Sequence, residues 1–346
     1  MRRARAILIY AAFWGMVFAQ AGASSNAAAG VVQSVDSIAI PVLDADRAID
    51  FYSRVLSFTK ITDREVAGNA YEHLFGLFGV RMRIVRMRLG DESIELMQYL
   101  SPHGRTLPAD NRSNDRWFQH IAIIVSDMDK AYALLRDRHV TFASPNPQVL
   151  PAWNANASGI VAFYFKDPDG NPLEILHFSP DKGAAKWHMP TVRAGVSRLF
   201  LGIDHTAIVV ADTEGSLKYY RDTLGFEVAG ESDNYGPEQE RLNNVFGAHL
   251  RITALRAQTG PGIELLEYLT PRTGRPYPAD SVASDQWQWV VNLRAQPQTV
   301  VESIDHFRGQ TWISNRPTTL NDRALGYARA FMLRDPDGHA DNLILE

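Results

Sequence analysis

The chain carries a long internal repeat, and this repeat limits the possible folds more than any other feature. Residues 36–58 align with residues 204–226 at an offset of 168 residues. At the same offset, to within two residues, an Asp-Pro-Asp-Gly motif at 167–170 recurs at 335–338. A chain of 346 residues with this symmetry is a tandem duplication, in which each half forms the same fold.

Each half also repeats itself, more faintly. Alternating apolar residues at 120–125, then a helical pattern that ends near Leu135, match residues 38–42 and a helical pattern that ends near Leu56. In both places an aspartate stands where the helix is expected to begin. Three further strands are expected to follow each helix, and the clearest candidates are 81–87, 161–165 and 173–176. The sequence therefore predicts an α+β chain of four tandem βαβββ modules.

The N-terminus has the pattern of a targeting segment. Arg2, Arg3 and Arg5 precede an apolar run at 7–18, and small residues suited to cleavage follow at 19–23. The run is short for a membrane span, and no basic cluster follows it. We therefore expect residues 1–23 to be a signal peptide, the protein to be exported to a periplasmic or secreted location, and no stable membrane anchor to remain after cleavage.

Charge and cysteine content exclude several classes of function. Lysine and arginine total 35 against 39 acidic residues, a net charge of −4 without a basic stripe, so nucleic acid is not an expected partner. The chain has no cysteine, which excludes disulfides, thiolate metal sites and cysteine nucleophiles. A metal site in this chain must use histidine, carboxylate or neutral oxygen ligands.

Three motifs resemble those of a known family. They are Asp-His-x-Ala-Ile at 204–208, Tyr-Tyr-Arg-Asp-x-Leu-Gly-Phe at 219–226 and Asp-Pro-Asp-Gly-x-x-x-Glu-Ile-Leu at 167–176. Together they resemble the vicinal oxygen chelate superfamily, which includes glyoxalase I, extradiol dioxygenases and bleomycin resistance proteins. The resemblance implies modules that pair into cup-shaped mixed-sheet barrels. It divides the chain into a first glyoxalase-like domain at 34–180 (modules one and two), a linker at 181–200 and a second domain at 201–346 (modules three and four).

The resemblance also implies metal ligands on the first and last strand of each contributing module. The residues at these positions are Ser37 and Glu95 in module one, His120 and Glu174 in module two, His205 and Glu264 in module three, and Val290 and Asn342 in module four. Only modules two and three keep a complete pair. If these two modules share a cup, His120, Glu174, His205 and Glu264 form one site. This arrangement is our preferred prediction.

A second pairing stays open at this point. If modules one and two share a cup, as in extradiol dioxygenases, Glu95 and Ser37 join His120 and Glu174, and the other cup keeps only His205 and Glu264. Either pairing predicts one divalent metal ion, with Zn, Ni, Fe, Mn and Co all compatible with imidazole and carboxylate ligands.

The implied function is that of a metal-dependent enzyme with glyoxalase-like isomerase or lyase chemistry. Its partner is a small substrate with two neighbouring oxygens, and Glu174 or Glu264 is the candidate general base. The alternatives are a ring-cleaving dioxygenase and a protein that binds and sequesters an aromatic compound without turnover. The chain is expected to be a monomer or a homodimer.

Overall fold

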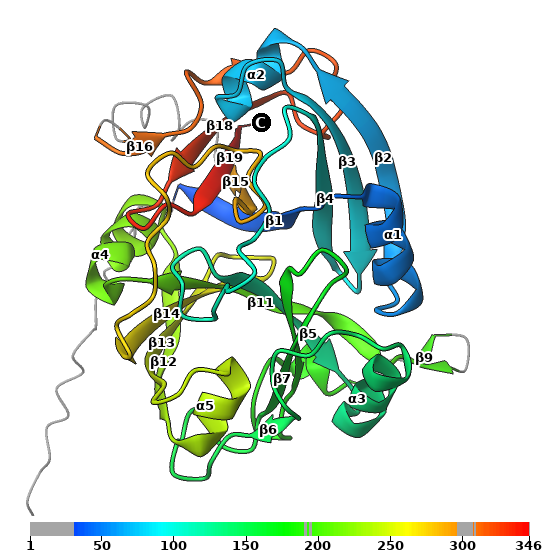
Figure 1. Cartoon of the computed structure of the whole chain (residues 1–346), viewed down its shortest axis with the longest axis vertical. Coiled ribbons are helices and arrows are strands. Elements are labelled where there is room, and N and C mark those ends of the chain that lie inside the picture. The colour runs from blue at the N-terminus through cyan, green and yellow to red at the C-terminus, as the bar shows by residue number, and fades with distance from the viewer. Residues whose placement is uncertain (1–30, 190–191, 194–195, 296–306, 308, 346) are drawn as a thin grey trace, which may run out of the picture.

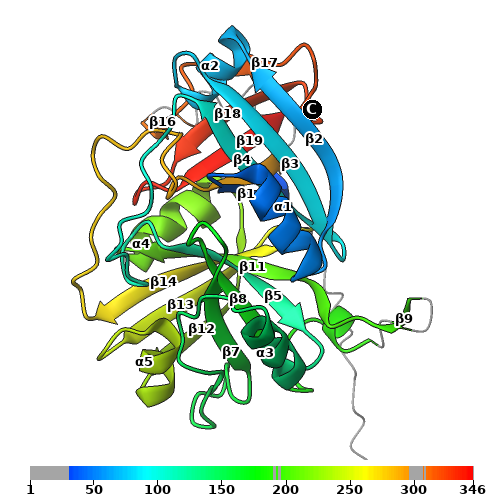
Figure 2. The same ribbon diagram turned by 45° about the vertical axis from the view of Figure 1, so that its right-hand side comes forward.

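The computed structural model describes residues 31–189, 192–193, 196–295, 307 and 309–345. The predicted signal peptide at 1–23 lies outside these residues. Two large mixed sheets stand one above the other along the long axis, and each curls into a half-barrel (Figures 1 and 2). We call them the upper sheet and the lower sheet. Helices and mixed sheets in this arrangement confirm the α+β class.

The upper sheet is built from the beginning and the end of the chain. Its strand order is β16-β18-β19-β15-β1-β4-β3-β2, with β17 paired to β18. The strands are β1 (Val32–Pro41), β2 (Thr59–Ala67), β3 (Arg81–Leu89), β4 (Glu92–Ser101), β15 (Val290–Ala295), β16 (Thr311–Trp312), β17 (Thr318–Thr319), β18 (Arg329–Arg334) and β19 (Ala340–Leu345).

The lower sheet is built from the middle of the chain, in the order β12-β13-β14-β11-β5-β8-β7-β6. Its strands are β5 (Gln119–Val125), β6 (Gln148–Val149), β7 (Val161–Lys166), β8 (Pro172–His177), β11 (Phe200–Val210), β12 (Glu227–Tyr235), β13 (His249–Arg256) and β14 (Gly262–Thr270). A separate small ribbon joins β9 (Val192–Arg193) and β10 (Val196–Ser197). The two sequence halves therefore contribute strands to both large sheets.

The two central strands of each sheet show how the sequence halves are combined. In the upper sheet β1 runs antiparallel to β15, and in the lower sheet β11 runs antiparallel to β5. The strands at 119–177 and 200–270 therefore share the lower sheet, while β1 to β4 share the upper sheet with β15 to β19. This strand order brings together the segments assigned to modules two and three, as in our preferred pairing. It does not bring together the segments assigned to modules one and two.

The helices are short. They are α1 (Ala45–Arg54), α2 (Asn69–Phe75), α3 (Met128–Asp137), α4 (Thr213–Leu217), the π-helix η2 (Lys218–Thr223), α5 (Pro237–Asn243) and the single 3-10 turn η1 (Ala185–Trp187). Those expected after Asp44 and Asp127 begin as the sequence predicts, whereas the helices at 69–75 and 237–243, between β2 and β3 and between β12 and β13, are not part of the predicted βαβββ unit. Asp44, Asp127 and Asp212 each accept a backbone N–H three residues later, which satisfies a free donor at the helix start. α1 ends at Arg54, two residues before the expected Leu56, and the residues at 296–306, where a helix of module four is expected, lie outside the described residues.

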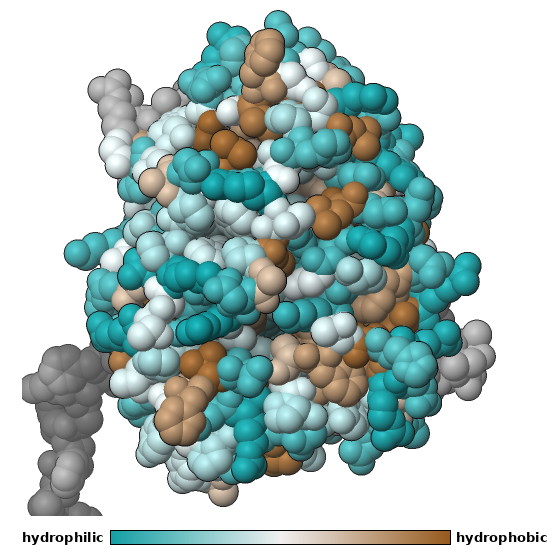
Figure 3. Space-filling view, in the orientation of Figure 1, coloured by the Kyte–Doolittle hydropathy of each residue, from teal (hydrophilic) through white to brown (hydrophobic). Residues whose placement is uncertain are grey.

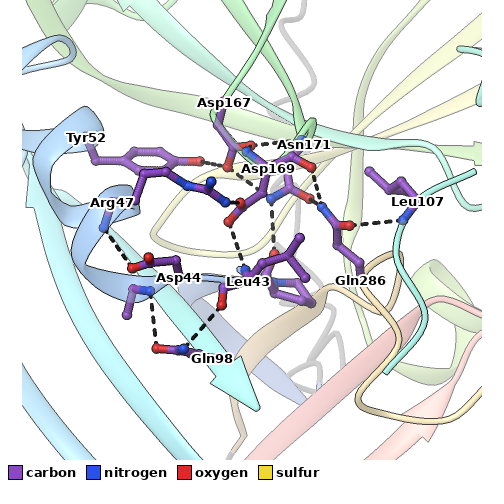
Figure 4. Close-up of polar contacts among 12 residues, drawn as sticks. Leu43, Asp44, Arg47, Tyr52, Gln98, Leu107, Asp167, Asp169, Asn171 and Gln286 are labelled. Carbon is purple, nitrogen blue, oxygen red and sulfur yellow. Dashed lines mark hydrogen bonds and ion pairs between the residues drawn. The ribbon is translucent and has the colours of Figure 1, made fainter. Parts of the chain in front are cut away.

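The Asp-Pro-Asp-Gly turn at 167–170 joins the two sheets. Asp167 accepts backbone N–H bonds from Asp169 and Asn171, which closes the turn between β7 and β8. Asp169 then accepts the backbone N–H of Leu43 at 2.8 Å and forms an ion pair with Arg47, at the start of α1 (Figure 4). The turn that connects two lower strands therefore anchors the first helix of the upper sheet.

None of the helices in the described part of the chain is long and apolar enough to cross a bilayer. On the face shown in Figure 3, hydrophilic side chains predominate and hydrophobic ones form small separate groups.

Candidate metal centre

Four adjacent strands of the lower sheet carry the four predicted ligands. His120 lies on β5, Glu174 on β8, His205 on β11 and Glu264 on β14, in the strand order β14-β11-β5-β8. Ala207 of β11 pairs with both His120 and Glu264 on the neighbouring strands. Because side chains alternate across a strand, His205 lies on the same face of the sheet as Ala207. The register therefore gathers imidazole and carboxylate groups on one concave face.

Three of these side chains converge on one point. Nε2 of His120 lies 3.2 Å from Oε2 of Glu174, and Nε2 of His205 lies 3.8 Å from the same oxygen. One ligand atom from each of the three residues lies within 4.8 Å of the others. All three are buried, with Glu174 only 4% exposed.

Glu264 holds a different position from the other three. Its Oε2 atom lies 3.3 Å from Nε2 of His205, but it is not part of the three-residue group whose ligand atoms lie within 4.8 Å of one another. Its side chain is 24% exposed, compared with 5% for Glu174. Glu264 therefore lies at the open side of the site.

Asp204 fixes the orientation of His205. Oδ2 of Asp204 lies 3.0 Å from Nδ1 of His205, and the guanidinium of Arg256 donates to the same oxygen at 2.7 Å. The indole N–H of Trp187 donates to Oδ1 at 3.0 Å. A carboxylate on the outer nitrogen of a metal-binding histidine fixes its tautomer and strengthens it as a ligand.

Neighbouring opposite charges determine the direction of the pKa shifts of His205 and Asp204. Burial opposes protonation of His205, but the carboxylates of Glu264, Asp204 and Glu174 outweigh it and raise the pKa of the imidazole to about 9. Burial would also raise the pKa of Asp204, but the hydrogen bonds and charges of His205 and Arg256 hold it well below its usual value. The buried site therefore attracts positive charge.

His120 is held by packing. Its ring lies 4.8 Å from that of Tyr164 and 5.6 Å from that of Phe118, measured between centroids. Its Nδ1 atom is buried and has no hydrogen-bond partner among the described residues, whereas its Nε2 atom faces Glu174. The two histidines thus present Nε2 to the same carboxylate.

This donor set fits a divalent transition metal. Two imidazole nitrogens and one or two carboxylate oxygens are the ligands that Zn, Ni, Fe, Mn and Co bind in proteins, and cysteine is not needed. The buried cluster of acceptors around His205 supplies the negative charge that a cation requires.

The site forms the floor of a large cavity, which we call the lower cavity. Its volume is about 750 Å³, and strands of the lower sheet line it together with residues 182–187. Leu150, Ile160 and Leu242 provide apolar wall, while Asn156 and Gln239 provide polar groups. Asn154 donates to Asn234 at 2.8 Å, so the loop after β6 meets the edge strand β12.

The equivalent positions of the upper sheet hold no such cluster. Ser37 donates to Glu95 at 3.3 Å, and Nδ2 of Asn292 donates to both, at 2.9 and 3.2 Å. Asn342 donates to Asn292, and Val290 is a buried apolar residue. Glu95, the alternative ligand, is therefore in a different sheet from His120. Ser37, Val290 and Asn342 thus occupy the upper-sheet positions that correspond to His205, His120 and Glu174 in the lower sheet.

Sequence reasoning missed the residues that support the site. Asp204 directly precedes His205. This Asp-His pair was a usable signal, because a carboxylate next to a metal-binding histidine often orients the imidazole ring. Arg256 and Trp187 reach Asp204 from β13 and from the segment before β9. No spacing in the sequence indicates these contacts.

Comparisons with known proteins agree with the fold. The model of the Glyoxalase/Bleomycin resistance protein/Dioxygenase superfamily matches residues 34–175 and 202–340. No curated protein matches the chain at a significant level.

Solved structures resemble the chain over most of its length. Glyoxalase I from Zea mays is 16% identical, with a TM-score of 0.59, and the match covers 90% of this chain and 92% of that chain. A putative dioxygenase from Bacillus subtilis is 15% identical, with a TM-score of 0.56, and the match covers 92% of this chain and 86% of that chain. At this level of identity the likeness concerns the fold. With both halves matched by the family model, the chain belongs to the glyoxalase/bleomycin resistance protein/dioxygenase superfamily.

Proposed function

We propose that this protein is an exported, metal-dependent enzyme of the vicinal oxygen chelate type, built from four modules of which two carry the metal. It acts on a small substrate with two neighbouring oxygens by glyoxalase-like isomerase or lyase chemistry. The observation that carries the proposal is the convergence of His120, Glu174 and His205 on the floor of the lower cavity.

One divalent ion per chain is the proposed cofactor. His120, His205 and Glu174 would hold it, and Glu264 would be the fourth ligand or would face the substrate. Such an ion supplies Lewis-acid stabilisation of negative charge on substrate oxygens.

Glu264 is our preferred general base, ahead of Glu174. Glu174 lies between the two histidines, while Glu264 contacts His205 from the open side of the site. In an isomerisation the Glu264 carboxylate takes a proton from a carbon beside a carbonyl, and the electron pair of the C–H bond moves onto the substrate oxygens. The carboxyl group then delivers a proton, the same one or one exchanged with solvent, to the former carbonyl carbon. The hydroxyl proton passes from one substrate oxygen to the other, so no proton is gained or lost overall.

The cavity walls restrict water and orient the substrate. Apolar side chains of Leu150, Ile160 and Leu242 line the same cavity as Glu264, and Arg256 is held by Asp204. A site that excludes water strengthens electrostatic interactions with the substrate. This arrangement supports a substrate with an apolar body and an oxygen-rich end.

Isotope exchange tests the proposal. The protein is purified anaerobically, its metals are measured by elemental analysis, and α-hydroxyketones are incubated with it in D2O. We expect one metal per chain and metal-dependent incorporation of deuterium beside the carbonyl. Glu264→Gln should lower the exchange rate about 100-fold or more with metal retained. Glu227→Gln, an exposed change on β12, is the matched control. A metal-free protein, or a Glu264→Gln variant with full exchange activity, would contradict the proposal.

A ring-cleaving dioxygenase is the second candidate. Two histidines and one carboxylate form the closest cluster of the site, and this set is typical of non-haem Fe(II) oxygenases. Oxygen uptake with catechol after anaerobic loading of Fe(II) distinguishes this activity from deuterium exchange. Tight binding of an aromatic compound such as bleomycin to metal-free protein, without turnover, would instead indicate sequestration.

Export and assembly need separate measurements. The N-terminal arginines, the apolar run and the small residues within 1–23 support cleavage and a periplasmic or secreted location. Mass spectrometry of the protein from its native host should find a chain that begins after residue 21 to 23. Light scattering is expected to find a monomer or a homodimer.

A further inference from the structure

The upper sheet has a second cavity, at the place that corresponds to the lower cavity. This upper cavity has a volume of about 410 Å³ and lies among β2, β3, β4, β15 and the loop before β18. Four arginines line it, Arg64, Arg86, Arg294 and Arg323, together with the carboxylates of Glu95 and Asp322.

The strand registers identify the lower-sheet equivalents of two of these arginines. Arg86 pairs with Glu95 across β3 and β4, and in the lower sheet Ala254 pairs with Glu264 in the same way. The methyl group of an alanine has thus been replaced by a guanidinium beside an equivalent glutamate.

Two further arginines of the upper cavity, Arg64 and Arg294, also have uncharged equivalents in the lower sheet. Arg64 pairs with Ile84 across β2 and β3, as Ser232 pairs with Ile252 in the lower sheet. Among the central strands, Arg294 occupies the position of Ile124. Several lining positions have therefore gained positive charge relative to the metal-site cavity.

The inner arginine, Arg86, forms ion pairs with two carboxylates at the floor of the upper cavity. Nη1 of Arg86 donates to Asp36 at 2.6 Å and to Glu95 at 3.1 Å, and Arg294 donates to Asp36 at 2.8 Å. Burial opposes ionisation of Asp36, but hydrogen bonds from Arg86 and the charges of both arginines outweigh it and lower its pKa. The cavity floor therefore already contains its cation.

Arg64 and Arg323, which we call the rim arginines, are not neutralised by ion pairs in this way. Arg64 and Arg323 are exposed, and neither makes a side-chain hydrogen bond or ion pair with any residue that the structure describes. Asp322 accepts the hydroxyl of Tyr71 at 2.8 Å, and Glu95 is occupied by Arg86, Ser37 and Asn292. Two free guanidinium groups thus face a cavity whose carboxylates are already engaged.

We propose that the upper cavity is a binding site for a small oxyanion, a carboxylate or a phosphate, held by Arg64 and Arg323. Guanidinium groups match the geometry of both anions through paired N–H donors, and they lose less hydration than ammonium groups on binding. The site is separate from the metal centre, since it belongs to the other sheet. It gives the chain one metal cavity and one anion cavity on equivalent halves of the fold.

Calorimetric titration of malonate and of inorganic phosphate into the full chain tests this site. The protein is first treated with a solid chelating resin, so that neither anion binds through a metal. We expect one saturable site per chain, and the anion with the higher affinity identifies the carboxylate or phosphate source. Replacing both rim arginines, Arg64→Gln with Arg323→Gln, should weaken binding about 10-fold or more.

Two controls locate the anion. Arg138→Gln removes an exposed arginine after α3 and should leave the affinity unchanged. His205→Ala, in the other cavity, should also leave it unchanged. Absence of saturable binding, equal affinity in the double arginine variant, or loss of binding only in His205→Ala would overturn the proposal. Because both rim arginines are exposed, thermal unfolding of the double variant should match that of the parent.

Discussion

Oδ2 of Asp204 lies 3.0 Å from Nδ1 of His205, and this contact decides which ring nitrogen faces the lower cavity. With Nδ1 held from behind, Nε2 is directed at Glu174 and Glu264. Arg256 and Trp187 in turn hold the Asp204 carboxylate. One ligand of the candidate metal centre is therefore positioned by a chain of contacts that reaches the segment joining the two sequence halves.

We predict that Asp204→Asn weakens metal binding about 10–100-fold, because the amide cannot provide the charged acceptor that orients His205. Competition with a chromophoric chelator measures the change. Asp233→Asn is a matched control, since Asp233 contacts His249 in an exposed histidine–carboxylate pair away from the metal ligands. Equal metal affinity in Asp204→Asn and the parent protein would refute the positioning role.

The upper sheet depends on Arg86 for charge balance. Its guanidinium serves Asp36 and Glu95, which are both largely buried, with side chains 11% and 7% exposed. We expect Arg86→Ala to lower the free energy of unfolding by about 2–3 kcal/mol, because Glu95 loses its ion pair with Arg86 and Asp36 is left with Arg294. The loss is less than for a fully buried pair, since the Arg86 side chain is 25% exposed.

Urea unfolding of the Arg86 variant measures this loss. Arg88→Ala, an exposed change on the same strand, should have little effect. Adding Glu95→Gln to Arg86→Ala should restore part of the stability. If the single Arg86 variant unfolds like the parent, the ion pairs contribute nothing to the fold.

A buried acid on β19 breaks the symmetry of the two sheets. Asp341 pairs with Leu333 as Leu173 pairs with Phe165, so an aspartate stands where the lower sheet has a leucine. Burial, and then the negative charge of Asp335, raise the pKa of Asp341 to about 8. His339 and the hydroxyls of Tyr219 and Tyr220 partly offset this rise.

We predict that the free energy of unfolding falls as the pH rises from about 4 to about 8. The folded-state pKa of Asp341 lies above the unfolded value near 4, so its stabilising contribution is complete below pH 4 and is lost by about pH 8. Asp341→Leu should raise the free energy of unfolding at pH 9 by ~1–3 kcal/mol and flatten the pH dependence. Urea unfolding at pH 5, 7 and 9 checks this, with Asp341→Asn as the variant that removes the charge and keeps the shape. An unchanged pH profile in both variants would show that Asp341 does not titrate in this range.

The sequence predicted the elements that repeat, and it missed contacts between repeats. Asp44 and Asp127 begin helices as expected, because an N-cap aspartate acts on its own neighbours along the chain. The placement of His120 and His205 on adjacent strands required only the family pattern and the choice of module pairing.

Other features depend on packing that no local pattern encodes. Trp187 reaches Asp204 from beyond the first sequence half, and Arg86 fills a site where its lower-sheet equivalent is Ala254. The separate position of Glu264 also depends on the tertiary structure, and the sequence shows only that a glutamate is present.

Metal stoichiometry tests the central claim most directly, namely that one metal site is shared by strands of the second and third modules. Elemental analysis after saturation with Ni or Zn is made on the parent chain and on His120→Ala, His205→Ala and Glu95→Gln, with circular dichroism to confirm folding. We predict one ion in the parent, none in either histidine variant and one in Glu95→Gln. Two ions in the parent chain, or a His205→Ala variant that keeps its metal while Glu95→Gln loses it, would contradict the account.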